Sequence, residues 1–580
     1  MFGYAGKCLK VNLSTRDIQV YGTREELCDE YLGGRGVGVA MIADRITREH
    51  DSPEMPLIFA TGPLVGTSAP TSGRMSVISR SPLTKTVFDC SVGGKFGTEL
   101  KKAGFDLIEI TGVSDKWVLL HIKNDRAFIE DAGALAGKNT SDVMEGIGRE
   151  GSHATIGIAG EKQVRFASIV FDGHYLAGRG GLGAVMGAKR LKAITVKGGG
   201  NNISVADPEG LKAAREEIMR LLRASPAVFG EFGLSDFGTA ALVDLIHARR
   251  MEPTENFKNT FFPHAPSYSG YAMKTYYKTK KTGCAGCPIL CKKIGMHGEV
   301  IPEFETVSHF GALNGCGDLS SIVEANRICN EYGLDTISAA STIACFSEIQ
   351  GKRLSAEEMI SLLISIARRD TRIGESLADG SLRYATSMGH PELSMSVKGL
   401  ELPAYDPRGA YGMALAYATS NRGGCHLRAY PISHEILRKP VATDRFSFEG
   451  KARIIKIAED LNAVVDSLTA CKFVFFAASL EEYAKALQAV TGNDFDVQSL
   501  LKIGERIWNL EKRLNGLNGF TSSDDDLPER FFKEEGTSSA NIRILPIDRD
   551  TFLGETKNYY RIRGYERGES GDRDFPKMAS

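Results

Sequence analysis

The chain has 580 residues, of which 42% are hydrophobic and 25% charged, as in ordinary globular proteins. This length exceeds what one hydrophobic core supports and predicts several domains. The 71 Lys and Arg residues balance the 72 Asp and Glu residues, and the net charge of −1 argues against general binding to nucleic acid or an anionic membrane. No apolar run of about 18 residues occurs and the first residues lack the apolar segment of a signal peptide, which favours a cytoplasmic location.

The first part of the chain, residues 1–202, is predicted to be rich in β-strands. Short apolar runs such as 107–110 and 117–122 are separated by Gly, Asp and Asn residues, and Asn124-Asp125 lies between two such runs as a hairpin turn would. The segment 198–202 is predicted to be a linker, after which Asp207-Pro208 opens a helix.

The remainder of the chain shows helical periodicity. Apolar residues recur three or four positions apart over 320–330, 335–345, 355–368, 449–465 and 498–515. The Pro-containing stretch 400–407 indicates a boundary, and the charged tail from Arg561 to Ser580 is expected to fray. The sequence therefore predicts an α+β multidomain protein, with a β-rich domain over 1–202 and mainly helical domains over 206–396 and 397–580.

Three cysteines, Cys284, Cys287 and Cys291, lie close together in the middle of the chain. Thiolates at this spacing converge on a small volume and suit an iron–sulfur cluster or zinc. The next histidine, His297, is six residues on and no second CxxC follows, so a four-ligand site needs one more ligand from elsewhere. The alternative is chance proximity among eleven cysteines, whose odd number and scatter argue against a disulfide framework.

Two arginines are flanked by glycine, Arg74 after Gly73 and Arg179 between Gly178 and Gly180. Glycine allows close approach of the backbone, and a guanidinium grips phosphate oxygens in a bidentate manner. The pair Gly93-Gly94 adds a third loop of this kind. Each loop alone is better explained by a tight turn with a surface Arg, but three in one domain indicate a phosphate-bearing cofactor.

Further candidates are polar residues at predicted helix ends and in loops. The segments 330–335 and 466–471 each begin with Asn or Asp and end with Asp or Cys, a spacing that suits hydrogen bonds to a nitrogen-rich heterocycle, although helix caps explain 330–335 equally well. Acid–base candidates occur in Glu303-Phe-Glu305 and in Cys425-His426. For the histidine, a solvated or buried structural role is the alternative.

Together these motifs closely resemble the tungsten-dependent aldehyde:ferredoxin oxidoreductase family, from Gly6 to about residue 530. The resemblance is densest over residues 62–74, 177–187, 400–409, 421–426 and 502–508. It implies that the β-rich domain forms a two-sheet base for a cofactor in which two pterin dithiolenes hold tungsten or molybdenum. It also implies a magnesium ion between the pterin phosphates and one [4Fe–4S] cluster.

The resemblance assigns these groups to individual residues. The cluster ligands would be Cys284, Cys287, Cys291 and Cys471, and the backbone carbonyls of Ser91 and Gly180 would bind magnesium. The pterin-binding residues would be Arg74, Ser91, Gly93, Arg179, Gly180, Leu182, Gly183, Asn330, Leu334, Asp335, Arg422, Arg428, Asp466, Ala470 and Lys472.

The chain departs from the family pattern in several places. Asn330 replaces an aspartate, Ser91 replaces an asparagine, Arg428 replaces a lysine, and Thr469-Ala470 replaces Gly-Leu. The metal-bridged dimer contact of the family uses Glu-x-x-His, where this chain has Arg327 as the fourth residue. Since Arg does not ligate metals, we expect no bridging ion there and instead an ion pair of Arg327.

The resemblance implies an oxidoreductase that converts aldehydes to carboxylic acids, or the reverse, and passes electrons to ferredoxin or a small polyferredoxin subunit. Glu305 would activate water and His426 would bond the carbonyl oxygen and shuttle the proton. The chain is expected to form a homodimer or hetero-oligomer. The alternatives are the active-site subunit of an aromatic-CoA reductase and, in another class, an electron-transfer subunit that retains only the cluster.

Overall fold

The computed structural model describes residues 1–148, 150–200 and 202–565. Two six-stranded sheets make up the N-terminal region, in the orders β2-β1-β6-β3-β4-β5 and β11-β10-β9-β12-β7-β8. The strands are β1 (Lys7–Asn12), β2 (Asp17–Gly22), β3 (Leu57–Ala60), β4 (Met75–Arg80), β5 (Val87–Val92), β6 (Leu107–Thr111), β7 (Val118–Lys123), β8 (Arg126–Asp131), β9 (Ser152–Thr155), β10 (Ile169–Phe171), β11 (Tyr175–Ala177) and β12 (Leu191–Lys197). Short hairpins follow at β13 (Lys280–Thr282) with β14 (Lys292–Ile294), and β15 (Ser396–Val397) with β16 (Leu400–Glu401).

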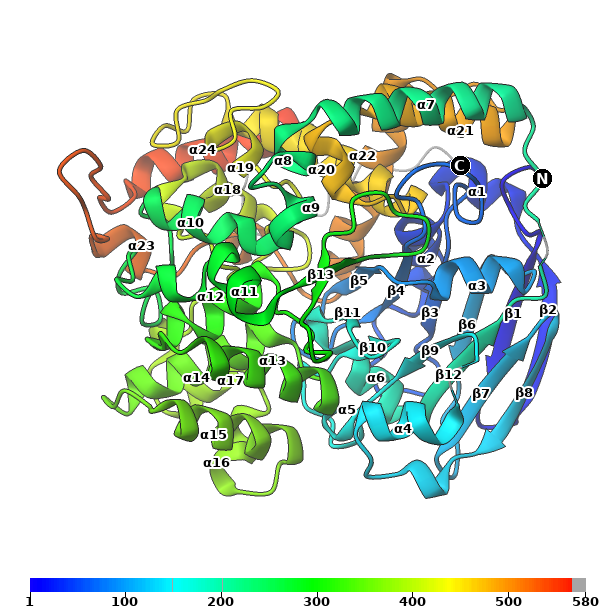
Figure 1. Cartoon of the computed structure of the whole chain (residues 1–580), viewed down its shortest axis with the longest axis horizontal. Coiled ribbons are helices and arrows are strands. Elements are labelled where there is room, and N and C mark those ends of the chain that lie inside the picture. The colour runs from blue at the N-terminus through cyan, green and yellow to red at the C-terminus, as the bar shows by residue number, and fades with distance from the viewer. Residues whose placement is uncertain (149, 201, 566–580) are drawn as a thin grey trace.

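Helices dominate the rest of the chain, which lies beside the sheets and across one end of them (Figure 1). Those of the N-terminal region are α1 (Glu25–Tyr31), α2 (Gly34–Ile42), α3 (Phe96–Lys102), α4 (Thr140–Ile147), α5 (Ile158–Glu161) and α6 (Leu182–Ala188). The remaining ones are α7 (Pro208–Ala224), α8 (Pro226–Phe229), α9 (Leu234–Phe237), α10 (Ala241–Ala248), α11 (Gly270–Tyr277), α12 (Phe304–Phe310), α13 (Leu319–Tyr332), α14 (Thr336–Ile349), α15 (Ala356–Arg368), α16 (Arg372–Leu377), α17 (Ser381–Ser387), α18 (Tyr411–Thr419), α19 (Ile432–Glu435), α20 (Lys451–Leu468), α21 (Leu480–Thr491), α22 (Val497–Leu517), α23 (Arg530–Lys533) and α24 (Arg549–Ile562).

The two sheets pack on one another through apolar side chains. The inner strands β3, β4 and β6 are buried along their whole length, including the polar residues Arg80 and Glu109, whereas every residue of the edge strands β2 and β8 is exposed or half-buried. Phe59 of β3 and Phe171 of β10 lie with ring centroids 6.4 Å apart, and Phe96 of α3 lies 5.3 Å from Phe171. The predicted α+β class with a two-sheet N-terminal region is confirmed.

Local signals in the sequence explain several element ends. Asn124, with a φ of 56°, turns β7 into β8, as the hairpin prediction requires. The Asp207 carboxylate accepts the Gly210 N–H at the start of α7. Gly333, with a φ of 73°, ends α13, and Asp335 then caps α14.

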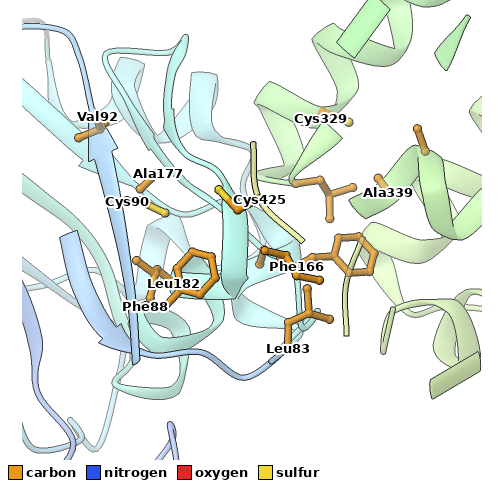
Figure 2. Close-up of a cluster of buried hydrophobic side chains, with 14 of the residues drawn as sticks. Leu83, Phe88, Cys90, Val92, Phe166, Ala177, Leu182, Cys329, Ala339 and Cys425 are labelled. Carbon is orange, nitrogen blue, oxygen red and sulfur yellow. The ribbon is translucent and has the colours of Figure 1, made fainter. Parts of the chain in front are cut away.

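The helical region meets the sheets along β5 and α6, which is where the candidate site lies. Figure 2 shows Phe88 and Cys90 of β5 beside Leu182 of α6, with Cys425 facing them. Cys329 of α13 and Ala339 of α14 approach the same core from the helical side.

Helices α7 and α21 run side by side across one end of the molecule (Figure 1), which joins chain segments that are remote in sequence. The domain boundaries at 202, 206 and 396 stay predictions. Most of the tail predicted to fray lies outside the described residues, because only Arg561 to Tyr565 of it are described, and α24 extends to Ile562. Within the described residues, no helix combines the length and apolar character needed to cross a membrane.

Candidate cofactor-binding and active site

The cysteine loop between β13 and β14 rests on two glycine loops of the first sheet. The Ala285 N–H donates to the Gly94 carbonyl at 3.0 Å, and a Cβ placed at Gly93 would lie 2.5 Å from the Cys284 Sγ atom. Any side chain at position 93 would therefore displace the thiol. From the far end of the chain, the Cys471 N–H donates to the Thr71 carbonyl at 3.0 Å, just before Arg74. The structure thus brings all four predicted cluster cysteines to one place.

These thiols interact electrostatically. Burial raises the pKa of Cys287 to about 12, and the neighbouring Cys471 and Cys284 thiols contribute to the rise. Four thiolates cannot stay ionised together in such a site unless a cation neutralises them, which is what iron supplies in a cluster. The four thiols are neighbours, but among the described residues no three His, Cys, Asp or Glu side chains lie close enough together to hold a single metal ion.

Arg74 connects the cysteines to β5. Its Nε donates to the Ser91 hydroxyl at 2.9 Å and its Nη2 to the Ser91 carbonyl at 2.8 Å. Burial alone would lower the pKa of Arg74, but the nearby Cys471 and Cys284 thiols raise it on balance. The guanidinium is therefore a fixed positive charge beside the cysteine site.

A first polar group lies where the end of α13 meets the glycine loop before α6. The Asp335 N–H donates to the Phe166 carbonyl, and the Arg179 Nε lies 3.4 Å from the Asp335 carboxylate. Arg179 also donates to the carbonyls of Glu401 at 2.6 Å and Gly424 at 3.3 Å. Gly180 and Gly181, with φ of 74° and 82°, produce the turn that presents Arg179.

A second polar group lies where the end of α20 meets the start of α2. The Asp466 carboxylate accepts hydrogen bonds from the Lys472 ammonium at 2.8 Å and from the Arg35 guanidinium at 3.4 Å. Arg35 forms a bidentate pair with Glu511, both bonds being 2.7 Å long. A Cβ at Gly34 would meet the Asp466 carbonyl at 2.5 Å, so close packing of α2 on α20 requires glycine there.

The loop 421–428 joins the two polar groups. Arg428 forms a short ion pair with Asp89 and lies 3.6 Å from the Asp466 carboxylate. Arg422 donates to the Asp89 carbonyl at 2.5 Å and to the Cys425 Sγ atom at 2.9 Å. Burial raises the pKa of the Cys425 thiol, but the positive charges of Arg422 and neighbouring arginines lower it on balance.

Glu305 and His426 face one another in the interior, with the Glu305 Oε1 atom 3.4 Å from the His426 Nε2 atom. Burial raises the pKa of Glu305 to about 8, partly opposed by the hydrogen bond from the Ala404 N–H to Oε2 at 2.8 Å. Burial and the nearby Arg179 lower the pKa of His426 well below its usual value. At neutral pH the carboxyl is therefore protonated and the imidazole neutral.

Buried polar atoms without a partner gather along this junction. Five side chains each have one buried atom that makes no hydrogen bond to any part of the chain that the structure describes: Arg179 Nε, Glu305 Oε1, His426 Nδ1, Arg428 Nε and Asp466 Oδ1. Native proteins rarely leave such atoms unpaired. The unpaired atoms include both cationic donors and acidic acceptors, as a ligand with phosphates and a nitrogen heterocycle requires, so the residues fit the bis-pterin cofactor predicted for them.

Comparison with known proteins decides the family. The family model described as "Aldehyde ferredoxin oxidoreductase, N-terminal domain" matches residues 8–198, and that for domains 2 and 3 matches residues 213–571. The chain belongs to the aldehyde ferredoxin oxidoreductase family. The predicted family, and with it the prediction of an oxidoreductase, is confirmed.

Relatives within the aldehyde ferredoxin oxidoreductase family align over nearly the whole chain. The tungsten-containing aldehyde ferredoxin oxidoreductase of Pyrococcus furiosus is 41% identical, and that of Thermococcus kodakarensis 40%, each over 97% of both chains. A WOR-like subunit of an aliphatic sulfonate oxidoreductase from Pyrococcus furiosus is 27% identical over 98% of this chain and 95% of its own. In the solved active-site complex BamBC of benzoyl coenzyme A reductase, a chain with 24% identity superposes with a TM-score of 0.82 over 97% of this chain and 95% of its own, which shows a shared fold.

Several residues assigned by family resemblance already make hydrogen bonds within the chain. The Ser91 carbonyl already accepts a bond from Arg74 and the Gly180 carbonyl one from Ser81, so each retains one lone pair for magnesium. The Asn330 carbonyl accepts the Thr140 hydroxyl at 2.9 Å while its side chain is buried. The remaining assigned positions, Gly93, Leu182, Gly183, Leu334, Ala470 and Lys472, line the same junction, and their cofactor contacts stay predictions.

The sequence did not identify two residues of the site, and it grouped Glu303 with Glu305 although their side chains have different partners. Glu303 was a candidate acid beside Glu305, but its carboxylate pairs with Lys292 at 2.7 Å on the cysteine side and plays no part in the pair with His426. Arg35 and its partner Glu511 were not singled out. Arg35 lies between Gly34 and Gly36, which is the same glycine-flanked pattern that drew attention to Arg179.

Proposed function

We propose that this protein oxidises aldehydes to carboxylic acids at a tungsten bis-pterin centre and passes the electrons through one [4Fe–4S] cluster to ferredoxin. The observation that carries the proposal is the buried pair of Glu305 and His426, 3.4 Å apart at the junction of the two polar groups. Two titratable groups with pKa values moved in opposite directions by burial are typical of acid–base sites. The 41% identity to a tungsten-containing relative supports the choice of metal and substrate class.

Each part of the cofactor has residues suited to hold it. Cys284, Cys287, Cys291 and Cys471 would ligate the cluster, and Arg74 would lie between cluster and pterin. Arg179 with Asp335 would hold one pterin, and Asp466 with Lys472, Arg422 and Arg428 the other, with magnesium on the carbonyls of Ser91 and Gly180. When bound, the metal supplies the two-electron redox chemistry and the cluster supplies single-electron transfer.

Residues of the chain itself would transfer the protons of the reaction. The Glu305 Oε1 atom makes no hydrogen bond to any described residue but lies 3.4 Å from His426 Nε2. In the proposed mechanism, substrate binding lets the protonated carboxyl donate to Nε2, which places the imidazole hydrogen on Nδ1. The Nδ1–H then bonds the carbonyl oxygen of the aldehyde. Once ionised, Glu305 takes a proton from the water that attacks the carbonyl carbon. Oxidation of an aldehyde by water releases two electrons and two protons, and this pair handles one proton at a time.

Aromatic side chains surround the pair and exclude bulk water. Tyr405 and Tyr430 contact His426 with ring centroids 5.7 and 6.0 Å away, and their hydroxyls lie 3.1 Å apart. Phe304 lies 5.2 Å from Tyr405. Such walls suit an apolar aldehyde and strengthen the electrostatic interactions inside the site.

The proposal is tested by metal analysis combined with kinetics. The purified protein is expected to contain tungsten, iron and magnesium and to reduce viologen with short, branched or aromatic aldehydes. Iron without tungsten or molybdenum would instead support the cluster-only subunit. Reduction of an aromatic acyl-CoA without aldehyde oxidation would support the CoA reductase alternative, for which a fold shared at 24% identity is weaker support.

The cellular setting of the enzyme is also a proposal. A cytoplasmic location follows from the reduced state that eleven cysteines and a cluster require. Arg327 forms ion pairs with Glu324 at 2.6 Å and Glu331 at 2.7 Å within its own helix, so its charge is already balanced inside the chain. A homodimer or a hetero-oligomer with a polyferredoxin would then use other contacts.

A further inference from the structure

The cysteine motif lies in a stretch of unusual charge. Between Asn256 and Gly298 the chain has seven lysines and no Asp or Glu, although acidic and basic residues balance over the whole sequence. The chemistry of the cluster does not require this, because Cys284, Cys287 and Cys291 occupy only a short part of the stretch. The excess of positive charge therefore calls for a separate explanation.

The structure exposes this charge beside the cysteines. Helix α11 runs directly into the β13–β14 hairpin whose loop carries the three cysteines (Figure 1). Lys278, Lys280 and Lys281 are exposed, and none of them forms an ion pair with any residue that the structure describes. Nearby lysines are already neutralised, Lys274 by Asp236 at 2.8 Å and Lys292 by Glu303 at 2.7 Å.

Exposed apolar side chains lie on the same helix and hairpin. Tyr271 is 66% exposed, Tyr276 70% and Met296 49%. The Met296 N–H donates to the Tyr277 carbonyl at 2.9 Å, which holds the residues after β14 against the end of α11. Leu290, in the cysteine loop itself, is 36% exposed. Aromatic residues and Met are enriched at protein–protein interfaces relative to the rest of the surface.

The cysteines are within reach of a partner on this face. Cys284, Cys287, Cys291 and Cys471 are all partly exposed, in contrast to the buried Cys329 and Cys345. Electron transfer between proteins requires the two redox centres to approach closely, so a carrier must dock over this loop. Unpaired lysines attract a negatively charged carrier and speed its encounter.

We propose that the surface formed by Lys278, Lys280, Lys281, Tyr276, Met296 and Leu290, called here the lysine hairpin surface, is the docking site of a small acidic one-electron carrier protein. This inference rests on the proposed function, since it assigns the exit of the electrons to that face. The contact is transient and small, as is usual between redox partners. Its strength decreases with salt because the lysines are exposed.

The test compares two charge-reversal variants of the loaded enzyme. One carries Lys278→Glu, Lys280→Glu and Lys281→Glu. The matched control carries Lys212→Glu, Lys485→Glu and Lys557→Glu, three exposed lysines on α7, α21 and α24. Both are assayed with an aldehyde and either a purified acidic ferredoxin or benzyl viologen, at low and high salt. Binding to immobilised ferredoxin is measured separately.

For the hairpin variant we expect kcat/KM for ferredoxin to fall by about tenfold or more at low salt, with a flattened salt dependence and weaker ferredoxin binding. The viologen rate and the control variant should stay within twofold of wild type. Equal effects of the two variants, or an unchanged kcat/KM in the hairpin variant, would overturn the docking site. So would binding of anionic vesicles or RNA that the hairpin substitutions abolish while ferredoxin binding persists. Absence of aldehyde-dependent viologen reduction in the wild type would contradict the proposed function, and the binding measurement would still decide the docking site.

Discussion

The Oε1 atom of Glu305 lies 3.4 Å from the Nε2 atom of His426, with both side chains largely buried. Burial favours the uncharged form of each, so it raises the pKa of Glu305 to about 8 and lowers that of His426. Around neutrality the carboxyl is therefore mostly protonated and the imidazole mostly neutral. The position of this pair beside the two polar groups is the reason for proposing it as the acid–base pair.

The pH dependence of turnover should report this titration. If ionised Glu305 is the base, kcat for aldehyde oxidation should rise about tenfold per pH unit below pH 8 and level off above it. The measurement is kcat with viologen from pH 6 to 9.5 at constant ionic strength. A kcat that is flat or falls through this range would show that the ionised carboxylate is not required.

Removing the carboxyl should stop the chemistry and leave the cofactors. Glu305→Gln keeps the acceptor for the Ala404 N–H but cannot take a proton, so kcat should decrease by about 100- to 10,000-fold. Tungsten and iron contents should equal those of wild type. Retained turnover with full metal content would remove Glu305 from the mechanism.

The same substitution should alter stability in a pH-dependent way. A carboxyl whose folded pKa is raised from 4.5 to about 8 stabilises the fold fully only below pH 4.5, and this contribution is lost as pH rises to 8. At pH 9, metal-free Glu305→Gln should therefore be more stable than metal-free wild type by up to about 5 kcal/mol, with no difference near pH 4. Urea unfolding at both pH values measures this, and a difference independent of pH would contradict the raised pKa.

The ion pair between Arg35 and Glu511 should contribute to the stability of the fold. It joins α2 to α22, and Arg35 also faces Asp466 and Asp89. Arg35→Met leaves three buried carboxylates short of a counter-charge and should reduce the free energy of unfolding by about 3–5 kcal/mol. The exposed Lys212→Met serves as control and should change it by less than about 0.5 kcal/mol. Equal stability of the two variants would refute the role of Arg35.

The fourth cysteine can be tested against another thiol. Cys471→Ser should abolish the electron paramagnetic resonance signal of the reduced cluster and decrease the iron content. Cys316→Ser changes a partly exposed cysteine outside the cysteine site and should preserve both. Because Cys471 also bonds Thr71 through its backbone, which serine retains, the fold should persist. A full cluster signal in Cys471→Ser would show that Cys471 is not a cluster ligand.

Periodicity and caps predicted much of the fold. Asp207, Gly333 and Asp335 mark helix ends through local hydrogen bonds and backbone angles, which neighbours in sequence determine. The strand order of the two sheets was not predictable, because β1 pairs with β6 across almost one hundred residues of chain. Long-range pairing of that kind leaves no local signal.

The site divides in the same way. Glycine-flanked arginines and clustered cysteines form recognisable local patterns, so the sequence alone identified them as candidate site residues. Asp89 lies in a strand and Glu511 in a helix, and neither belongs to a local motif. Their importance appears only in the fold, where Arg428 pairs with Asp89 and Arg35 with Glu511. Glu303 and Glu305 look equivalent in sequence, yet the first turn of α12 directs them to Lys292 and to His426 respectively.

The hydrogen bond between Cys471 and Thr71 links the timing of synthesis to the metal site. The cysteine triplet leaves the ribosome well before Cys471, which follows α20 in the chain. A chain that ends before Cys471 therefore carries three of the four proposed cluster ligands and lacks the one that bonds the Thr71 loop. If the four cysteines bind one cluster, the complete ligand set exists only once the chain has been made beyond residue 471.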